Sequence, residues 1–127
     1  MRYASFVVPS MITKEGVTMV RWIGAPGGGF TVPPPASLDD LHGGSAVGKR
    51  QLEQPVVDPA APWRVYDLAS RVDRRDYCLA VIRHARQPAD LADYLSAEIL
   101  ELAADDFMPL LPGPIAERWR DAHPHLG

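Results

Sequence analysis

The sequence predicts a mainly α-helical protein, in which a small domain of about three helices follows a short β-hairpin and a long extended arm rich in proline and glycine. Two observations lead to this fold class. Residues 1–62 hold 8 Pro and 8 Gly, whereas residues 63–127 hold 5 Pro and 2 Gly. In the second part, apolar side chains recur with the period of an α-helix. The chain therefore divides into a hairpin and arm, residues 1–62, and a helical domain, residues 63–127.

The hairpin is expected at the very start of the chain. Residues 3–8 and 17–23 are rich in β-branched and aromatic side chains, and the Lys-Glu-Gly sequence at 14–16 is typical of a turn. A two-stranded hairpin of this size is marginally stable in water by itself. We therefore expect it to pack against another surface.

The arm is expected over residues 24–62. Gly27-Gly28-Gly29 is flexible enough for a hinge, and the three prolines at 33–35 favour an extended polyproline II conformation. Ser37 predicts the cap of a single helical turn. Because breakers are so frequent, we expect residues 24–62 to lack fixed structure unless a partner binds them.

The first helix of the domain is predicted to begin after Ser70, with Asp73 three residues later as in a capping box, and to run to about Ala85. It contains an unbroken apolar run over residues 77–82, which predicts a central position in the domain. Trp63 is interpreted as an aromatic anchor that closes the core.

Two further helices are predicted from their prolines. Pro88 begins a helix that is expected to end by about Phe107, and Pro114 begins a third that His123-Pro124 ends. Trp119 on the third helix is interpreted as a second core anchor. Residues 64–86 carry a net charge of +3 and residues 87–127 one of −6, which predicts that the helices complement each other.

Length, charge and cysteine count exclude several classes of protein. The 127 residues are too few for a large catalytic scaffold, and a single Cys excludes an internal disulfide framework and a multi-cysteine zinc site. No run approaches the roughly 18 apolar residues of a membrane helix, and the apolar stretch after Arg2 is too short for a signal peptide. A net charge of −3 disfavours duplex DNA and acidic membranes as partners. We expect the cytoplasm or a virion as its location.

No motif predicts an enzyme. Residues 43–49 match the spacing of a phosphate-binding loop, but Arg50 replaces the Ser or Thr that would hold magnesium, and no buried strand precedes the loop. Cys78 and His84 lie about 240° apart around a helix, so they cannot form a nucleophile and its base. We expect Cys78 to be a small core residue.

The remaining polar pairs also lack a catalytic pattern. Asp39-Asp40 is expected in a helical first turn and Asp105-Asp106 at a helix end. His123 and His125 supply two ligands without a third and are expected in a frayed polar tail. We therefore predict no catalytic residue, no metal and no cofactor.

Five side chains are candidates for partner binding. Trp22 and Phe30 flank the glycine hinge and could anchor the arm in a pocket of a partner, because aromatic residues carry much of the energy of interfaces. The others are Arg71, Arg74 and Arg75. They lie in the first turn of a helix, where positive charge is unfavourable unless an anionic partner or the neighbouring aspartates offset it.

A stretch of the helical domain resembles known proteins. The sequence Trp-Arg-Val-Tyr-Asp-Leu-Ala-Ser at 63–70, followed by Asp73-Arg74, Tyr77 and the Leu111-Pro112 that leads to Trp119, resembles small helical proteins that actinobacterial phages and prophages encode near their morphogenesis genes. The resemblance spans residues 63–119 and implies a role in the virion or its assembly.

These observations favour a non-enzymatic structural or assembly protein. A 65-residue helical unit buries a modest share of its surface, and the arm adds few core residues, so a partner would stabilise both. The expected partners are protein subunits of a larger assembly, with copies of the same chain among them, rather than a membrane, a nucleic acid or a small-molecule substrate. The alternative is a small regulatory or nucleic-acid-binding helical module that uses the Arg71, Arg74 and Arg75 end of the first helix.

Overall fold

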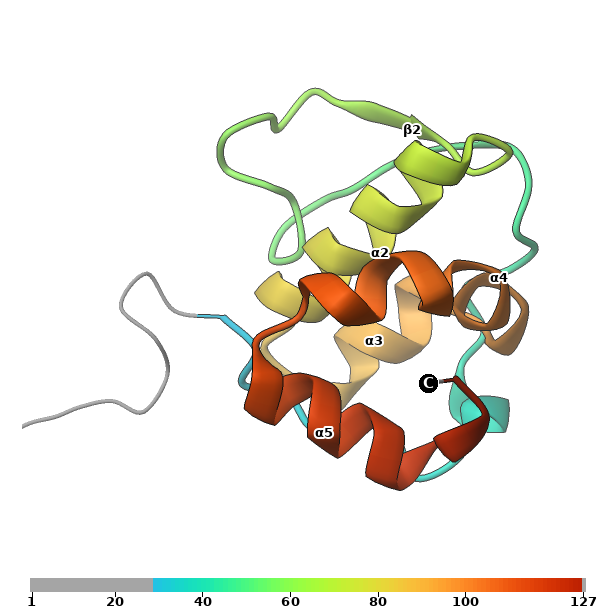
Figure 1. Ribbon diagram of the computed structural model, residues 1–127. Coiled ribbons are helices and arrows are strands. Elements are labelled where there is room, and N and C mark those ends of the chain that lie inside the picture. The colour runs from blue at the N-terminus through green and yellow to red at the C-terminus, as the bar shows by residue number, and fades with distance from the viewer. Residues whose placement is uncertain (1–28, 127) are drawn as a thin grey trace, which may run out of the picture.

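The computed structural model describes residues 29–126, which fold into four α-helices and one two-stranded antiparallel hairpin (Figure 1). The helices are α2 (Arg71–His84), α3 (Pro88–Tyr94), α4 (Ala97–Phe107) and α5 (Gly113–Ala122), and the strands are β1 (Lys49–Gln51) and β2 (Val65–Asp67). The mainly helical class is confirmed. The hairpin predicted over residues 3–8 and 17–23 lies outside the described residues, and β1 and β2 form a different one.

Helix α2 lies at the centre of the fold, as its apolar run predicts. It begins where expected, since the hydroxyl of Ser70 accepts a hydrogen bond from the backbone N–H of Asp73. Its buried side chains are Tyr77, Cys78, Ala80, Val81 and Ile82, and α4 packs against it. The helix ends at His84, one residue before the predicted boundary.

The prediction of one helix from Pro88 to Phe107 is wrong, because the structure contains two. Helix α3 ends at Tyr94, and Leu95 takes an extended conformation. The hydroxyl of Ser96 then accepts a hydrogen bond from the N–H of Ile99 at 3.2 Å and caps α4. The break keeps Leu91, Leu95 and Ile99 in the core while changing the direction of the chain.

Helix α5 and the residues after it close one side of the core. Trp119 is 1% exposed, as expected for a core anchor. The expectation of a frayed tail is wrong for His123, which is 4% exposed and whose Nε2 lies 2.7 Å from the carbonyl oxygen of Pro35. Leu126 is buried as well, in the short 3-10 helix η3 (Pro124–Leu126).

Residues 30–62 pack on the helices, whereas the sequence led us to expect no fixed structure there without a partner. Seven of their apolar side chains belong to the same core cluster as the helices: Val32, Leu38, Leu41, Ala46, Leu52, Val56 and Val57. The single turn after Ser37 is confirmed as the 3-10 helix η1 (Leu38–Asp40). In Figure 1 the first part of this segment runs along α5 to η1, and the chain then continues to the hairpin. Isolated apolar residues between prolines and glycines thus act as separate anchors.

Two backbone hydrogen bonds hold this segment to the C-terminal end of α3. The N–H of His42 donates to the carbonyl of Ala92 at 2.9 Å, and the N–H of Gly43 donates to that of Leu95 at 2.8 Å. A Cβ atom on Gly43 would lie 2.4 Å from the backbone of Tyr94, so this close approach requires glycine. Within residues 29–126, no helix has both the length and the apolar character needed to cross a membrane.

Candidate functional site

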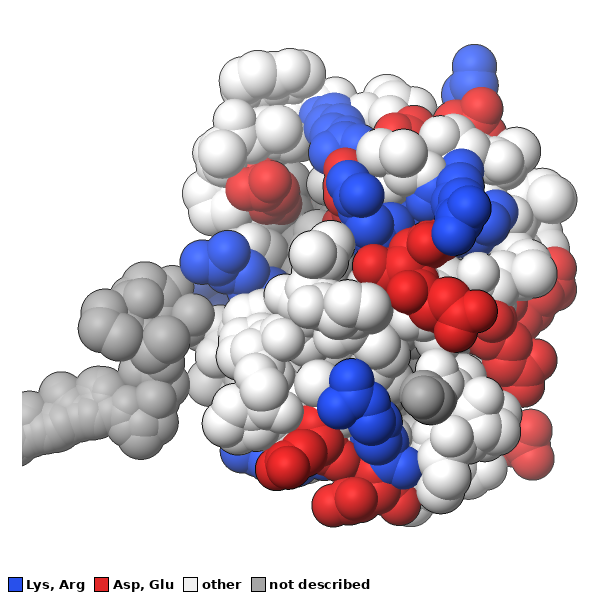
Figure 2. All heavy atoms as spheres, in the orientation of Figure 1, with Lys and Arg blue, Asp and Glu red and all other residues white. Residues whose placement is uncertain are grey.

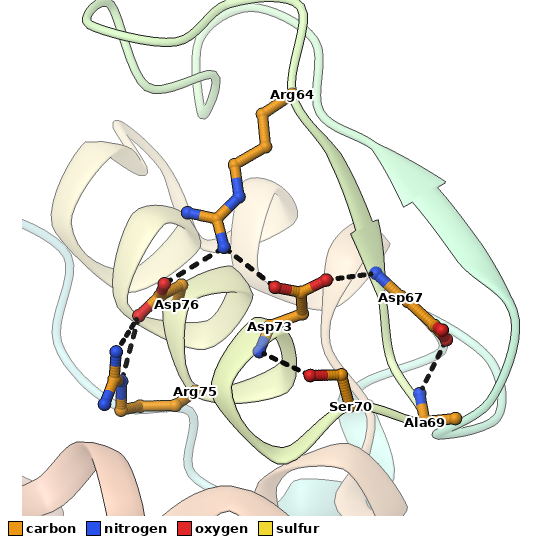
Figure 3. Close-up of polar contacts among 7 residues, drawn as sticks. All are labelled: Arg64, Asp67, Ala69, Ser70, Asp73, Arg75 and Asp76. Atoms are coloured by element: carbon orange, nitrogen blue, oxygen red, sulfur yellow. Dashed lines mark hydrogen bonds and ion pairs between the residues drawn. The ribbon is translucent and has the colours of Figure 1, made fainter.

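The hairpin is joined to the first half of α2 by a network of ion pairs (Figure 3). The guanidinium of Arg64, just before β2, lies 3.0 Å from carboxylate oxygens of both Asp73 and Asp76 on α2. It also covers the ring of Tyr66, with 4.5 Å between its central carbon and the ring centroid. One arginine therefore fixes the strand to the helix.

Asp73 serves both elements at once. Its second carboxylate oxygen accepts a hydrogen bond from the backbone N–H of Asp67 at 3.0 Å. This backbone hydrogen bond and the neighbouring Arg64 hold the pKa of Asp73 below its usual value. Asp73 is therefore ionised at neutral pH and pairs as a carboxylate with the guanidinium of Arg64.

The three arginines proposed for partner binding each contact a group of the same chain. Arg71 forms a bidentate pair with Asp106 of α4 at 2.8–3.0 Å, and Arg75 lies 2.8 Å from Asp76. Arg74 donates from Nη1 to the carbonyl of Leu68 at 2.9 Å. Figure 2 shows the resulting alternation of basic and acidic side chains on this face.

The loop that resembles a phosphate-binding loop is closed by its own arginine. The guanidinium of Arg50 donates to the carbonyl oxygens of Gly43 at 2.7 Å and Ser45 at 2.8 Å. Its Nη1 also lies 3.4 Å from the hydroxyl of Tyr77, which itself donates to the carbonyl of Tyr94 at 2.7 Å. A phosphate cradle needs backbone N–H groups that point inward, whereas here carbonyl groups face a cation.

The remaining polar candidates do not converge. Cys78 is fully buried, which raises the pKa of its thiol far above the usual value and confirms it as a core residue. Asp39-Asp40 lies in η1 and Asp105-Asp106 in the last turn of α4, as expected. Residues 29–126 place no three His, Cys, Asp or Glu side chains together as a metal site would require.

Trp63 is not the core anchor that the sequence led us to expect. Its side chain is 72% exposed, although the amide of Gln51 donates to its carbonyl oxygen at 3.2 Å and so fixes its backbone beside the hairpin. Val65, two residues later, is 53% exposed, while the next residue, Tyr66, is buried. We call Trp63 and Val65 the hairpin face.

The burial pattern of β2 fits this arrangement. Residues 65–67 alternate between exposed, buried and half-buried, as in a strand with one face on the core. Trp63 follows Pro59-Ala-Ala-Pro62, a stretch with turns at both of its prolines. Aromatic size alone suggested burial of Trp63, and its 72% exposed side chain contradicts that interpretation.

The two aromatic residues that flank the glycine hinge have different outcomes. Phe30 is half-buried against its own core, with a left-handed φ of 59° and its N–H 2.8 Å from the carbonyl of Arg83. Trp22 lies outside the described residues.

Comparison of the chain with models of protein families, with curated proteins and with solved structures gives no match.

Proposed function

We propose that the chain is a non-enzymatic structural or assembly protein that binds other protein subunits, with copies of itself among the candidate partners. The observation that carries this proposal is the exposed side chain of Trp63 on the hairpin face. We further propose a phage head or tail, or a factor that assembles one, as the setting. Support for that setting is the resemblance of residues 63–119 described above.

The hairpin face has the properties of a protein contact. Tryptophan is among the residues that contribute most to association, since it buries a large area and loses little conformational entropy. The backbone of Trp63 is already held by Gln51, and Arg64 next to it is fixed by two carboxylates. A partner would therefore meet an apolar anchor on a preformed support.

The alternative, a nucleic-acid-binding module, has less support. Its basic end of α2 is offset by Asp76 and Asp106, so fewer cations remain to neutralise phosphates. On α5, Arg118 and Arg120 stand beside Glu117 and Asp121. Binding to duplex DNA with a steep salt dependence would favour the alternative.

The proposal is tested by measuring mass in solution against protein concentration. Light scattering of the full chain should give species above the monomer mass of 13.9 kDa. Trp63→Ala should weaken the association about thirtyfold or more, the effect of losing an interface hot spot. Leu110, which is 55% exposed in the 3-10 helix η2 (Met108–Leu110), supplies the matched control Leu110→Ala.

Each outcome has a clear meaning. Equal weakening by both substitutions would point to general loss of apolar surface and would contradict the role of the hairpin face. A wild-type chain that stays monomeric at 100-fold higher concentration would exclude copies of itself as partners.

A further inference from the structure

An apolar groove lies between the proline-rich segment and α3. Its volume is about 330 Å³, and its only charged lining residue is Asp40. One wall comes from the proline segment and the other from the start of α3, with two buried leucines between them. The lining residues are Pro33, Pro34, Pro35, Ala36, Asp40, Leu41, Pro88, Ala89, Leu91 and Ala92.

Both walls are held in place by hydrogen bonds. The buried ring of His123 fixes the proline wall through its 2.7 Å contact with the carbonyl of Pro35. The N–H of His42 fixes the other side by donating to the carbonyl of Ala92. A groove that is formed in advance costs little ordering free energy when it is filled.

The lining defines the chemistry of the occupant. Apolar walls with one carboxylate suit an apolar side chain that has a cation beside it. Proline rings pair well with aromatic rings, as in the recognition of proline-rich segments by aromatic grooves. The volume lies at the small end of the range for ligand sites, which suits one large side chain rather than a cofactor.

The chain itself supplies such a group. Trp22 lies seven residues before Gly29, where the described residues begin, and this stretch reaches at most about 25 Å when extended. Arg21 is its neighbour, and residues 1–28 as a whole carry more basic than acidic residues. A tether of this length also gives a high effective concentration at the groove.

We propose that residues 17–23 dock in this groove, with the indole of Trp22 against the proline wall and Arg21 opposite Asp40. This docking adds a binding mode to the assembly function proposed above. It rests on that function only where the segment docks on another copy of the chain. When the segment comes from a neighbouring copy, the groove is the place where the arm binds that neighbour.

Residues 3–8 are the competing occupant, since Tyr3 follows Arg2. Tyr3 lies 26 residues before Gly29, so closing the longer loop is less favourable, and its ring is smaller than an indole. The test below includes this segment as an alternative that would overturn the proposal.

Disulfide cross-linking of the full chain tests the docking. The native Cys78 is fully buried and does not compete. Ile23→Cys is combined with Ala89→Cys in the groove, or with Leu110→Cys at an exposed site outside it. We expect the Ala89 pair to cross-link at least tenfold faster than the Leu110 pair. Adding Trp22→Ala should remove that difference, whereas adding Tyr3→Ala should leave it.

The outcomes separate this inference from the proposed function. Equal rates for the two pairs, or a rate that responds to Tyr3→Ala instead of Trp22→Ala, would overturn the docking. Mixing chains that each carry one of the two cysteines shows whether the segment crosses between copies. If the disulfide forms only within one chain, the docking is supported, and contacts between copies then depend on the hairpin face. If assembly depends on Trp63 but neither cysteine pair cross-links selectively, the proposed function stands and docking in the groove is overturned.

Discussion

Arg71 on the first turn of α2 holds Asp106 on the last turn of α4 through two parallel hydrogen bonds, from Nε and Nη2 at 2.8 Å each. The pair joins the basic stretch, residues 64–86, to the acidic stretch, residues 87–127. It also places a carboxylate at the start of α2, where positive charge would otherwise oppose the helix dipole. The predicted complementarity between the helices is thus confirmed at this contact.

Asp106→Asn should lower the thermal midpoint slightly at neutral pH. The hydrogen bonds from Arg71 hold the pKa of Asp106 below its usual value, so the ionised carboxylate stabilises the fold. That contribution is complete at neutral pH and is lost as pH falls through the lowered pKa. Thermal melts should therefore differ at pH 7 and converge in strong acid. Asp105→Asn, one residue away and exposed, is the control and should change little at either pH.

Trp119→Ala should cost about 3–5 kcal/mol of unfolding free energy, the usual cost of removing a large buried aromatic side chain. Trp119 is 1% exposed, whereas Trp63 is 72% exposed. Trp63→Ala should therefore stay within about 0.5 kcal/mol of the wild type. Urea unfolding followed by circular dichroism measures both. A large loss for Trp63→Ala would show that its ring packs inside the protein and would remove the hairpin face.

Gly43→Ala and Gly113→Ala form a matched pair, in which only the first meets the backbone of another element. A methyl group at Gly43 would meet the backbone of Tyr94 and Leu95 at 2.4–2.5 Å, which we expect to destabilise by about 1–3 kcal/mol. At Gly113 a Cβ atom would meet no atom within 4 Å apart from its chain neighbours. Ala is favourable in a helix but unfavourable before Pro114, so Gly113→Ala should change the free energy of unfolding by less than about 1 kcal/mol. Similar effects of the two substitutions would contradict the close approach between residue 43 and the end of α3.

Cys78 should not react with thiol reagents in the native protein. Its side chain is fully buried, and burial raises the pKa of its thiol, so both access and the thiolate are lacking. Labelling should become fast only in denaturant, at a midpoint equal to that of circular dichroism. Fast labelling without denaturant would show local opening of α2.

The elements that carry capping signals could be predicted from the sequence. Ser70, Pro88 and Pro114 mark the starts of three helices, and Ser37 marks η1. The break at Ser96 could not, because apolar periodicity continues through Leu95 and Ile99, and the third helical position holds Ile in place of the Glu or Gln of a capping box. The sequence pattern thus indicated that residues 88–107 can be helical, but it did not indicate that the chain is extended at the buried Leu95.

The candidate site was harder to predict than the helices. The partners of Arg71 and Arg64 lie on other elements, so sequence spacing could not assign them. Aromatic size did not predict that Trp63 is exposed, and the fixed position of residues 30–62 depends on single apolar anchors such as Val32 and Leu52. The composition of that segment shows its many prolines and glycines. It does not show the contacts of its apolar side chains with the helices, which exist only in the folded protein.

The two-stranded hairpin has a consequence for unwanted polymerisation. Within residues 29–126 the sheet consists of β1 and β2 alone, so each strand has one edge that is not paired with another strand. Open edges invite strand addition by other chains, and short, charged strands resist it. β1 is Lys49-Arg50-Gln51, and β2 ends in Asp67. The backbone beside Trp63 thus discourages amyloid-like stacking, while the indole stays accessible to a partner that recognises side chains.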